Sequence, residues 1–470
     1  MPDSLDLSRV HVMPREADQL LVMDRLSGRW AYLPAHEQAF LELLGTPAVT
    51  LGSHSPGVAE RVASLRELLI KLQIGTVGAE KKFGRLNTII LKLTNACNLA
   101  CAYCYDFEKI EKSTRLELGL ARKAMDQAMA MCEGTLSIIL HGGEPMLVWP
   151  FIEQIVFEGE ALARERQVDV RFTGQTNMTR LTQRAVDFSD EHDITWGVSL
   201  DGIPAINDRF RTGHDGTGSF DLFLQALQKW PDFVRRSSVM TTVTAANESL
   251  LLEAARYFRS LGMAGWDWSL FQPIGRGRDG TQFHIDIGQL CEAWDQLFEA
   301  VVAGEFHGFP VQPVKKYLDN FWHGPGGNMC LRPQCGAARD LLSISANGTI
   351  EACDCIDPRG PLAGLGHLSN TTLAAARSSP VAEAIRSRDM SNHPQCASCV
   401  WYGVCGGTCV AHAGRLDAVW QDSCAVALLA FDRISNTLAN STALQRYVAS
   451  LAGERLSSNL SAGELTVPTE

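Results

Sequence analysis

The sequence predicts an α/β fold built on a partial (β/α)6 barrel of parallel strands, similar to a TIM barrel. Between residues 88 and 271, six short apolar segments alternate with five helical stretches. Repeated strand–helix units give a parallel sheet with right-handed crossovers, and the active-site groups of such barrels lie at the carboxyl ends of the strands. A loop with three cysteines follows the first strand, where this rule expects the chemistry.

The barrel elements are predicted from runs of β-forming residues and the helical stretches between them. The predicted strands are 88–93, 136–140, 168–172, 194–200, 239–244 and 266–271. The predicted helices are 116–131, 151–166, 181–192, 220–229 and 250–261. We therefore assign residues 86–305 to the barrel.

Residues 1–80 are predicted to form a separate, small α+β module. Apolar runs at 10–13, 20–23 and 30–33 indicate three strands, and the turn at 24–28 indicates a hairpin between the last two. Two amphipathic helices follow, near 36–44 and 58–72. The glycine-containing segment 75–84 is expected to link this module to the barrel.

Composition restricts the class of protein. The chain has 470 residues, 46% of them hydrophobic and 20% charged, which predicts a globular protein of roughly three domains. The net charge of −11 and the lack of a basic run argue against nucleic-acid binding. We find no signal peptide and no run of about 20 apolar residues that could span a membrane. Fourteen cysteines without an export signal indicate metal binding in the cytoplasm rather than disulfides.

The first cysteine motif is a C-x3-C-x2-C loop made by Cys97, Cys101 and Cys104. Three thiolates on a cluster of four irons leave one iron open, and an open iron can bind and activate a small molecule. The alternatives are a zinc knuckle and buried free thiols. A zinc site normally has a fourth Cys or His close in sequence, and none follows Cys104.

A second set of cysteines lies in the C-terminal part, after a Gly/Pro-rich loop at 323–328. The pattern is C-x12-G-x4-C, a gap, C-x2-C-x5-C-x3-C, a gap, and a last cysteine, with the glycine at Gly348 in a predicted hairpin turn at 346–349. The alternative is two zinc ribbons. The cysteines of this part are Cys330, Cys335, Cys353, Cys355, Cys396, Cys399, Cys405, Cys409 and Cys424.

The first motif resembles the signature of the radical S-adenosylmethionine (SAM) enzymes, including an aromatic residue just before the third cysteine. A Gly-Gly-Glu-Pro motif follows about 40 residues later, as in that family. The resemblance implies that Cys97, Cys101 and Cys104 hold a [4Fe-4S] cluster that binds SAM. It also implies that the residues that contact SAM are Tyr103, Gly142, Gly143, Glu144, Pro145, Asn177, Ser199 and Arg211.

Two of these assignments leave alternatives open. Arg211 is expected to pair with the SAM carboxylate, but Arg209 competes with it, and either arginine could form an ordinary surface salt bridge instead. Glu144 is expected to accept hydrogen bonds from the SAM amino group. His141 is more simply interpreted as a packing residue.

The C-terminal pattern resembles the SPASM extension, which we place at residues 306–450, with a C-terminal tail at 451–470. By resemblance to the sulfatase-maturing enzymes, it implies two auxiliary [4Fe-4S] clusters, and therefore three clusters in the chain. Their ligands would be Cys330, Cys335, Cys353 and Cys409 for one, and Cys396, Cys399, Cys405 and Cys424 for the other. Cys355, Cys132 and Cys291 are left over, the last two as packed thiols.

Asp354 follows Cys353 directly, and the aspartate of such a Cys-Asp pair is assigned in the sulfatase maturases as the base that deprotonates the substrate. A carboxylate next to a cluster and a buried substrate is a plausible proton acceptor. The alternative is a turn aspartate in the segment 354–358.

The N-terminal module resembles the winged-helix module that binds leader peptides, which captures its ligand by adding a strand to a sheet edge. The alternative is an extension that only caps the barrel. Together the resemblances imply an enzyme that uses a 5′-deoxyadenosyl radical to make a crosslink, a thioether or an oxidised residue in a precursor peptide. They also imply an electron donor such as flavodoxin or ferredoxin. The alternatives are a formylglycine-forming sulfatase maturase, a small-molecule oxidase and a zinc-ribbon binding protein.

Overall fold

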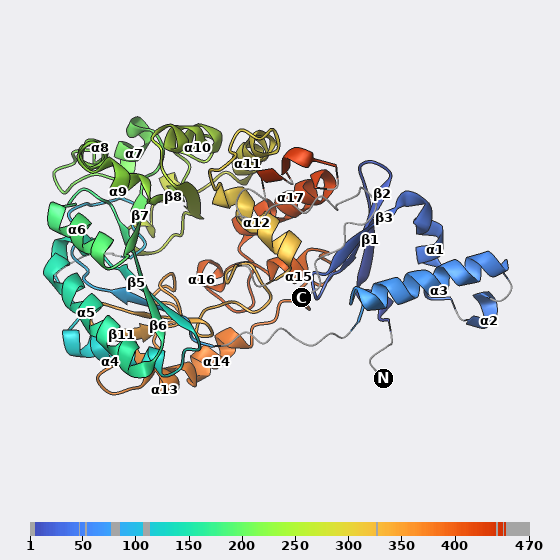
Figure 1. The fold of residues 1–470 in the computed structure, drawn as a ribbon, viewed down its shortest axis with the longest axis horizontal. Helices are drawn as coiled ribbons and strands as arrows, with labels where there is room; N and C mark the ends of the chain where they lie inside the picture. Colours follow the sequence, from blue (N-terminus) through green and yellow to red (C-terminus); the bar gives the residue numbers. More distant parts are fainter. Residues whose placement is uncertain are drawn as a thin grey trace.

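The computed structural model describes residues 5–46, 48–51, 54–76, 85–106, 113–325, 328–438, 440–444 and 446–447. Most of the predicted linker, at 77–84, and the predicted C-terminal tail, at 451–470, lie outside the described residues. Figure 1 shows the barrel strands with helices on their outer side and the N-terminal module at the opposite end of the molecule.

A parallel sheet of six consecutive strands forms the barrel, as the sequence predicts. The strands pair in chain order and in parallel: β4 Thr88–Lys92, β5 Thr135–His141, β6 Asp169–Thr176, β7 Thr195–Ser199, β8 Ser238–Val243 and β9 Gly265–Leu270. The predicted helices are α4 Leu118–Met129, α5 Trp149–Arg166, α6 Gln183–Glu191, α8 Phe220–Lys229 and α10 Leu251–Ser260. Two short helices that we did not predict, α7 Pro204–Phe210 and α9 Pro231–Arg235, flank α8.

Three C-terminal strands extend this sheet beyond β4. The predicted turn at Gly348 joins β10 Leu341–Ile344 to β11 Thr349–Glu351 as an antiparallel hairpin, and β12 Gly366–His367 pairs with β11. The sequence did not predict that β10 pairs in parallel with β4, so that Leu341 lies opposite Thr88 and Ile344 opposite Leu91. The pairing fixes the second cysteine region to the strand that leads into the first cysteine loop.

Helices complete the C-terminal part. Helix α12 Gln312–His323 packs against both α17 Gln421–Thr437 and β9, and α11 Ile287–Val302 packs against α17. Four short helices follow the hairpin: α13 Leu373–Arg377, α14 Pro380–Arg386, α15 Tyr402–Cys405 and α16 Val410–Ala413. Within the described part of the chain, no helix is both long enough and apolar enough to cross a bilayer.

The N-terminal module has the three predicted strands, β1 Val10–Arg15, β2 Gln19–Asp24 and β3 Trp30–Pro34, in an antiparallel sheet. Its helices are α1 Gln38–Glu42, the unpredicted α2 Ala48–Leu51, and α3 Pro56–Lys71. Because side chains alternate between the two faces of a strand, Leu20 and Val22 pack toward α1 and α3, whereas Leu21 and Met23 join the core of the rest of the protein.

Two aromatic residues of β3 attach this sheet to the C-terminal helices. The Trp30 ring stacks on Phe321 of α12 at 4.7 Å, and its indole N–H donates to the Phe321 carbonyl at 2.6 Å. The Tyr32 hydroxyl donates to the carbonyl of Ser435 in α17 at 2.6 Å. Both faces of the three-stranded sheet are therefore covered, one by its own helices and one by α12 and α17.

Trp30→Ala should destabilise the protein by about 3–5 kcal/mol, because it removes a buried indole and leaves a cavity between the sheet and α12. Urea unfolding of the anaerobic protein, followed by circular dichroism, measures the change. Leu222→Ala, at a side chain of α8 that is 41% exposed, is the matched control and should cost less than about 0.5 kcal/mol. Equal stability of the two variants would contradict the role assigned to Trp30.

Candidate functional site

The cysteine loop after β4 is held by the end of β5. The backbone N–H of Gly143 donates to the Thr94 carbonyl at 2.7 Å, and that of Glu144 donates to the Ala96 carbonyl at 2.8 Å. A Cβ on either Gly142 or Gly143 would overlap backbone atoms of residues 93–96. The two glycines of the Gly-Gly-Glu-Pro motif therefore allow two loops to lie backbone against backbone.

The end of α7 and the loop after β9 hold the other side of the loop. The N–H of Ala100 donates to the Thr212 carbonyl at 2.7 Å, and that of Ala102 donates to the Phe210 carbonyl at 3.1 Å. The N–H of Arg276, in the loop after β9, donates to the Cys104 carbonyl at 2.8 Å. The three thiols are thus fixed at the mouth of the barrel, where the sequence placed them.

The environment of these thiols fits a bound cationic centre. Burial raises the pKa of Cys97 to about 12 and that of Cys101 to about 11, and the Arg211 charge opposes the effect at Cys101. A metal that binds thiolates offsets this cost of ionisation.

The spacing of the three thiols also bears on the kind of metal site. Three or more thiolates on one tetrahedral zinc would lie about 3.8 Å apart, given a Zn–S distance of about 2.3 Å. Among the described residues, only Cys353, Asp354 and Cys355 place three ligand atoms within 4.8 Å of one another. The wider spacing of Cys97, Cys101 and Cys104 suits a cluster of several metal ions.

Glu144 ties the end of β5 to the end of β6. Its carboxylate accepts hydrogen bonds from the Thr176 hydroxyl at 2.6 Å, the Asn177 N–H at 2.8 Å and the Met146 N–H at 2.9 Å, and the residue is only 1% exposed. Burial raises its pKa, and these hydrogen bonds oppose the rise. Pro145 begins the short 3-10 helix Pro145–Val148 that leads into α5.

Asn177 and Ser199 lie at neighbouring strand ends beside the loop. The Asn177 side-chain amide donates to Asn98 Oδ1 at 3.1 Å and lies 4.0 Å from Cys97 Sγ. Ser199 accepts a hydrogen bond from Gln175 Nε2 at 2.8 Å. Both therefore lie at the mouth of the barrel, as predicted.

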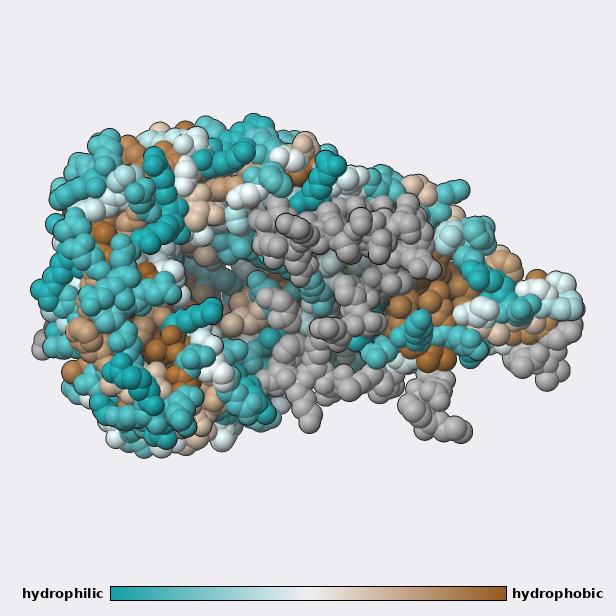
Figure 2. Space-filling view, viewed as in Figure 1, coloured by the Kyte–Doolittle hydropathy of each residue, from teal (hydrophilic) through white to brown (hydrophobic). Residues whose placement is uncertain are grey.

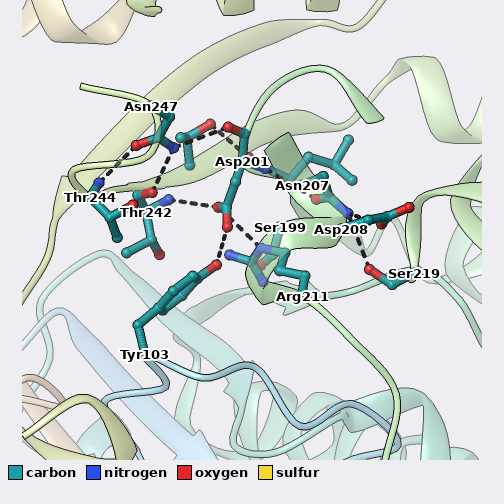
Figure 3. Close-up of polar contacts among 12 residues, drawn as sticks. Tyr103, Ser199, Asp201, Asn207, Asp208, Arg211, Ser219, Thr242, Thr244 and Asn247 are labelled. Carbon is teal, nitrogen blue, oxygen red and sulfur yellow. Dashed lines mark hydrogen bonds and ion pairs between the residues drawn. The ribbon is translucent and has the colours of Figure 1, made fainter. Parts of the chain in front are cut away.

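Asp201 joins Arg211 to the cysteine loop (Figure 3). Its carboxylate lies 3.1 Å from Arg211 Nε, accepts from the Thr242 N–H at 3.1 Å, and accepts from the hydroxyl of Tyr103. The Arg211 guanidinium lies 5.5 Å from the centre of the Tyr103 ring and is buried, whereas Arg209 is exposed. Of the two competing arginines, the structure brings Arg211 to the loop.

Tyr103 is buried in an aromatic cluster with Phe271 and Phe283, and its hydroxyl faces Asp201. The sequence analysis did not identify Asp201. The one signal for it in the sequence is an acidic residue two positions after Ser199, at the end of a predicted strand.

Asp354 lies across from the cysteine loop, in a cavity of about 330 Å³ between the end of β4 and the β10–β11 hairpin. Its Oδ2 accepts from the Tyr105 hydroxyl at 3.1 Å. Lys92, the last residue of β4, donates to Asp106 Oδ1 at 2.8 Å and to the Asp354 carbonyl at 3.3 Å. Sequence reasoning did not identify Lys92, Tyr105 or Asp106, whose proximity to Asp354 depends on the pairing of β10 with β4.

The charges around Asp354 keep it ionised. Burial would raise its pKa, but His141 and Lys92 together with the Tyr105 hydroxyl lower it below the usual range. Burial lowers the pKa of His141, whose ring Nδ1 has no hydrogen-bond partner among the described residues. A carboxylate in this setting can accept a proton from a group that enters the cavity.

The C-terminal cysteines lie in two regions. Cys396, Cys399, Cys405 and Cys424 line one cavity of about 300 Å³. The thiols of Cys335, Cys353 and Cys409 are near enough to that of Cys330 to act on it electrostatically, and Cys330 and Cys409 act on Cys355 in the same way.

Of the three cysteines left over, Cys355 lies beside the group of Cys330, Cys335, Cys353 and Cys409. Its thiol is 3.8 Å from Asp354 Oδ1, and the thiol of Cys353 is 3.4 Å from the same oxygen. Cys132 and Cys291 are each partly buried on helical segments away from both groups, as predicted for packed thiols.

The chain was compared with known proteins. Residues 91–258 match the family described as the Radical SAM superfamily. The chain is 28% identical to mycofactocin maturase MftC of Mycobacterium tuberculosis over 338 residues, which cover 68% of this chain and 77% of the relative. It is 20% identical to the cysteine-type anaerobic sulfatase-maturating enzyme of Clostridium novyi over 343 residues, 69% of this chain and 87% of the relative.

Two solved structures share the fold. Native anSMEcpe with bound AdoMet matches with a TM-score of 0.66 at 17% identity, over 75% of this chain and 98% of that one. Streptococcus suis SuiB bound to precursor peptide SuiA matches with a TM-score of 0.51 at 14% identity, over 86% of this chain and 95% of that one. Residues 91–258 of the chain thus match a radical SAM domain, and maturases are among its relatives, whereas the two solved structures show that the chain shares their fold.

Proposed function

We propose that this chain is a radical SAM enzyme that modifies a side chain of a ribosomally made peptide. The radical SAM domain implies SAM and a [4Fe-4S] cluster. The observation that carries the proposal is the position of Asp354, which lies in a cavity directly across from the cysteine loop and bonds to Tyr105 of that loop. When bound, the cluster on Cys97, Cys101 and Cys104 supplies the electron that cleaves SAM to methionine and a 5′-deoxyadenosyl radical.

The residues at the strand ends orient SAM in this proposal. Asp201 engages Nε of Arg211, so the two outer nitrogens of the guanidinium remain able to meet the SAM carboxylate. Ser199 and Asn177 offer polar groups on either side of the loop. Glu144 fixes the backbone of Asn177, and its three protein donors leave one of the roughly four lone-pair sites of the carboxylate for the SAM amino group.

Asp354 takes a proton from the substrate in this proposal. The Tyr105 hydroxyl orients the carboxylate, and Lys92 holds the adjacent backbone by its hydrogen bond to the Asp354 carbonyl. The carboxylate is ionised and can therefore accept a proton.

The two groups of C-terminal cysteines support two auxiliary [4Fe-4S] clusters, each with four protein ligands. Clusters without an open iron transfer electrons rather than bind SAM. They would accept an electron from the substrate as a crosslink, a thioether or an oxidised residue forms. A small electron carrier such as flavodoxin or ferredoxin would reduce the enzyme.

The N-terminal module supports a peptide substrate. SuiB, a structural neighbour, is described as bound to its precursor peptide. Among the described residues, β1 and β3 each pair only with β2, so each has one edge free of other strands. Figure 2 shows apolar side chains gathered over this sheet and its helices. A leader peptide could add a strand to one of these edges.

A second candidate function is formylglycine formation on a sulfatase, which the similarity to the Clostridium novyi enzyme favours. It uses the same scaffold but acts on a Cys or Ser of a protein. The two candidates differ in product chemistry, since formylglycine carries an aldehyde and a crosslink does not.

Anaerobically reconstituted enzyme, incubated with SAM and a candidate precursor peptide encoded near its gene, should give 5′-deoxyadenosine and a peptide lighter by about two hydrogens. Mass spectrometry measures both products. A hydrazide probe should leave the peptide unmodified, because a crosslink has no aldehyde.

The triple variant Cys97→Ala/Cys101→Ala/Cys104→Ala is the control. It should lose all SAM cleavage and keep about two thirds of the iron, since two of three four-iron clusters remain. An aldehyde product would instead establish the sulfatase-maturase function, and zinc without sulfide in the wild-type protein would exclude both.

Asp354→Asn should lower product formation by about 10²–10⁴-fold, the usual contribution of a general base, while SAM cleavage persists. Asp357→Asn is the matched control, because Asp357 lies three residues away and pairs with Arg278 at 2.9 Å. It should retain most of the activity. Loss of both products in Asp354→Asn, or of neither, would contradict the proposed base.

Leader binding should protect the backbone amides of one edge strand, β1 or β3, from hydrogen exchange, because an added strand takes up their free N–H groups. Hydrogen-exchange mass spectrometry of the full-length enzyme with and without the precursor peptide measures this effect. Central strand β2 is the internal control and should not change. A peptide that is modified without protecting either edge would show that residues 1–80 do not bind the leader.

A further inference from the structure

The turn between β2 and β3 of the N-terminal module reaches the second group of C-terminal cysteines. Leu26, in this turn, packs in a small apolar cluster with Met390, Tyr402 and two of the four cysteines, Cys396 and Cys424. Segments nearly 400 residues apart in sequence therefore meet at one site.

Arg25, next to Leu26, is bonded to the backbone that carries these cysteines. Its Nε donates to the carbonyl of Ala397 at 3.0 Å, and its guanidinium also donates to the carbonyl of Ser391 at 3.1 Å. Ala397 lies between Cys396 and Cys399.

The turn is rigid and closely packed. Asp24, which is fully buried, accepts from the N–H groups of Leu26 at 2.8 Å and Ser27 at 3.2 Å and pairs with Arg9 at 2.9 Å. A Cβ on Gly28 would lie 2.8 Å from Val404 Cγ1, in the helix that ends at Cys405. The turn thus forms a fitted contact rather than a loose surface loop.

We propose that the β2–β3 turn, residues 24–28, supports from outside the segment that carries Cys396 and Cys399, and that Arg25 is a positioning residue for the iron–sulfur cluster held by Cys396, Cys399, Cys405 and Cys424. This inference rests on the proposed function, which assigns a cluster to these four cysteines. Among the described residues, no other side chain of the N-terminal module bonds to the segment that carries Cys396 and Cys399.

The physical effect of Arg25 is electrostatic and steric. Reduction adds a negative charge to a cluster, and a nearby cation stabilises the reduced form, so Arg25 raises the reduction potential. Its bonds to Ser391 and Ala397 also hold the ligand loop in place. The N-terminal module is therefore part of an electron-transfer site in addition to any role in peptide binding.

The test is a redox titration of the full-length chain, monitored by electron paramagnetic resonance. The first cluster is removed by the substitution of Cys97, Cys101 and Cys104 with alanine, so that only auxiliary signals remain. The signal of the second auxiliary cluster is the one that Cys424→Ala abolishes. Iron and sulfide are measured for every variant.

Arg25→Met should move the midpoint potential of this signal to a more negative value. We expect the equilibrium constant for one-electron reduction to fall about tenfold, which corresponds to a shift of about 59 mV. The other auxiliary signal should not move. Arg25→Lys should restore most of the shift because it keeps the charge. Arg29→Met, the matched control in the same hairpin, removes the same charge and should leave both midpoints unchanged.

Unchanged midpoint and iron content in Arg25→Met would overturn the inference, as would an equal shift in Arg29→Met. Loss of about four irons in Arg25→Met that Arg25→Lys restores would support it. If Cys424→Ala removes no iron and no signal, the cluster assignment in the proposed function is itself wrong, and this result is distinct from an unchanged Arg25 variant.

Discussion

The close contact between the cysteine loop and the strand end after β5 is the constraint on which the site depends. Because Gly143 and Glu144 bond to the carbonyls of Thr94 and Ala96, the loop takes its shape from the parallel sheet rather than from its own residues. Glycine is required at 142 and 143 because any side chain there would overlap the loop backbone. Glu144 also fixes the end of β6, because its carboxylate accepts a hydrogen bond from the backbone N–H of Asn177. The thiols are therefore preorganised by three neighbouring strand ends.

The pairing of β10 with β4 brings the C-terminal part to this site. Strand β4 ends in Lys92 and leads into the cysteine loop, and β10 leads through its hairpin to Asp354. Strand β11 runs antiparallel to β10, so the chain after β11 must turn back toward β4 to bring Asp354 against Lys92 and Tyr105. The positive charge of Lys92 and the hydrogen bond from the Tyr105 hydroxyl offset the cost of burying the Asp354 carboxylate. The sheet pairing and this turn together place the proposed base next to the loop where the radical would form.

The sequence was sufficient for features encoded by local pattern or by spacing. The six barrel strands follow from short runs of β-forming residues, and the two groups of C-terminal cysteines were expected from the resemblance of their spacing to the SPASM extension. Contacts between distant segments could not be predicted in this way. The ion pair between Arg211 and Asp201 depends on how the chain after α7 returns to the end of β7, and the pairing of β10 depends on which sheet edge is free. Leu341–Ile344 is four residues long and buried throughout, so its sequence does not indicate a partner strand.

The N-terminal sheet is packed on both faces, one against α1 and α3 and the other against α12 and α17. Its β2–β3 turn packs against the second group of cysteines. Among the described residues, the outer edges of β1 and β3 pair with no other strand, so these edges are where a peptide strand would add under the proposed function. A strand added at either edge would twist the sheet as a unit, since strands in a sheet share hydrogen bonds along their length. Removal of residues 1–80 would expose the surfaces of α12 and α17 that pack against Trp30 and Tyr32, and it would also remove Arg25 from the cysteine site. A truncated enzyme without activity would therefore not distinguish a lost leader-binding site from a damaged cluster. Point substitutions and hydrogen exchange separate these two causes because they leave both faces of the sheet packed.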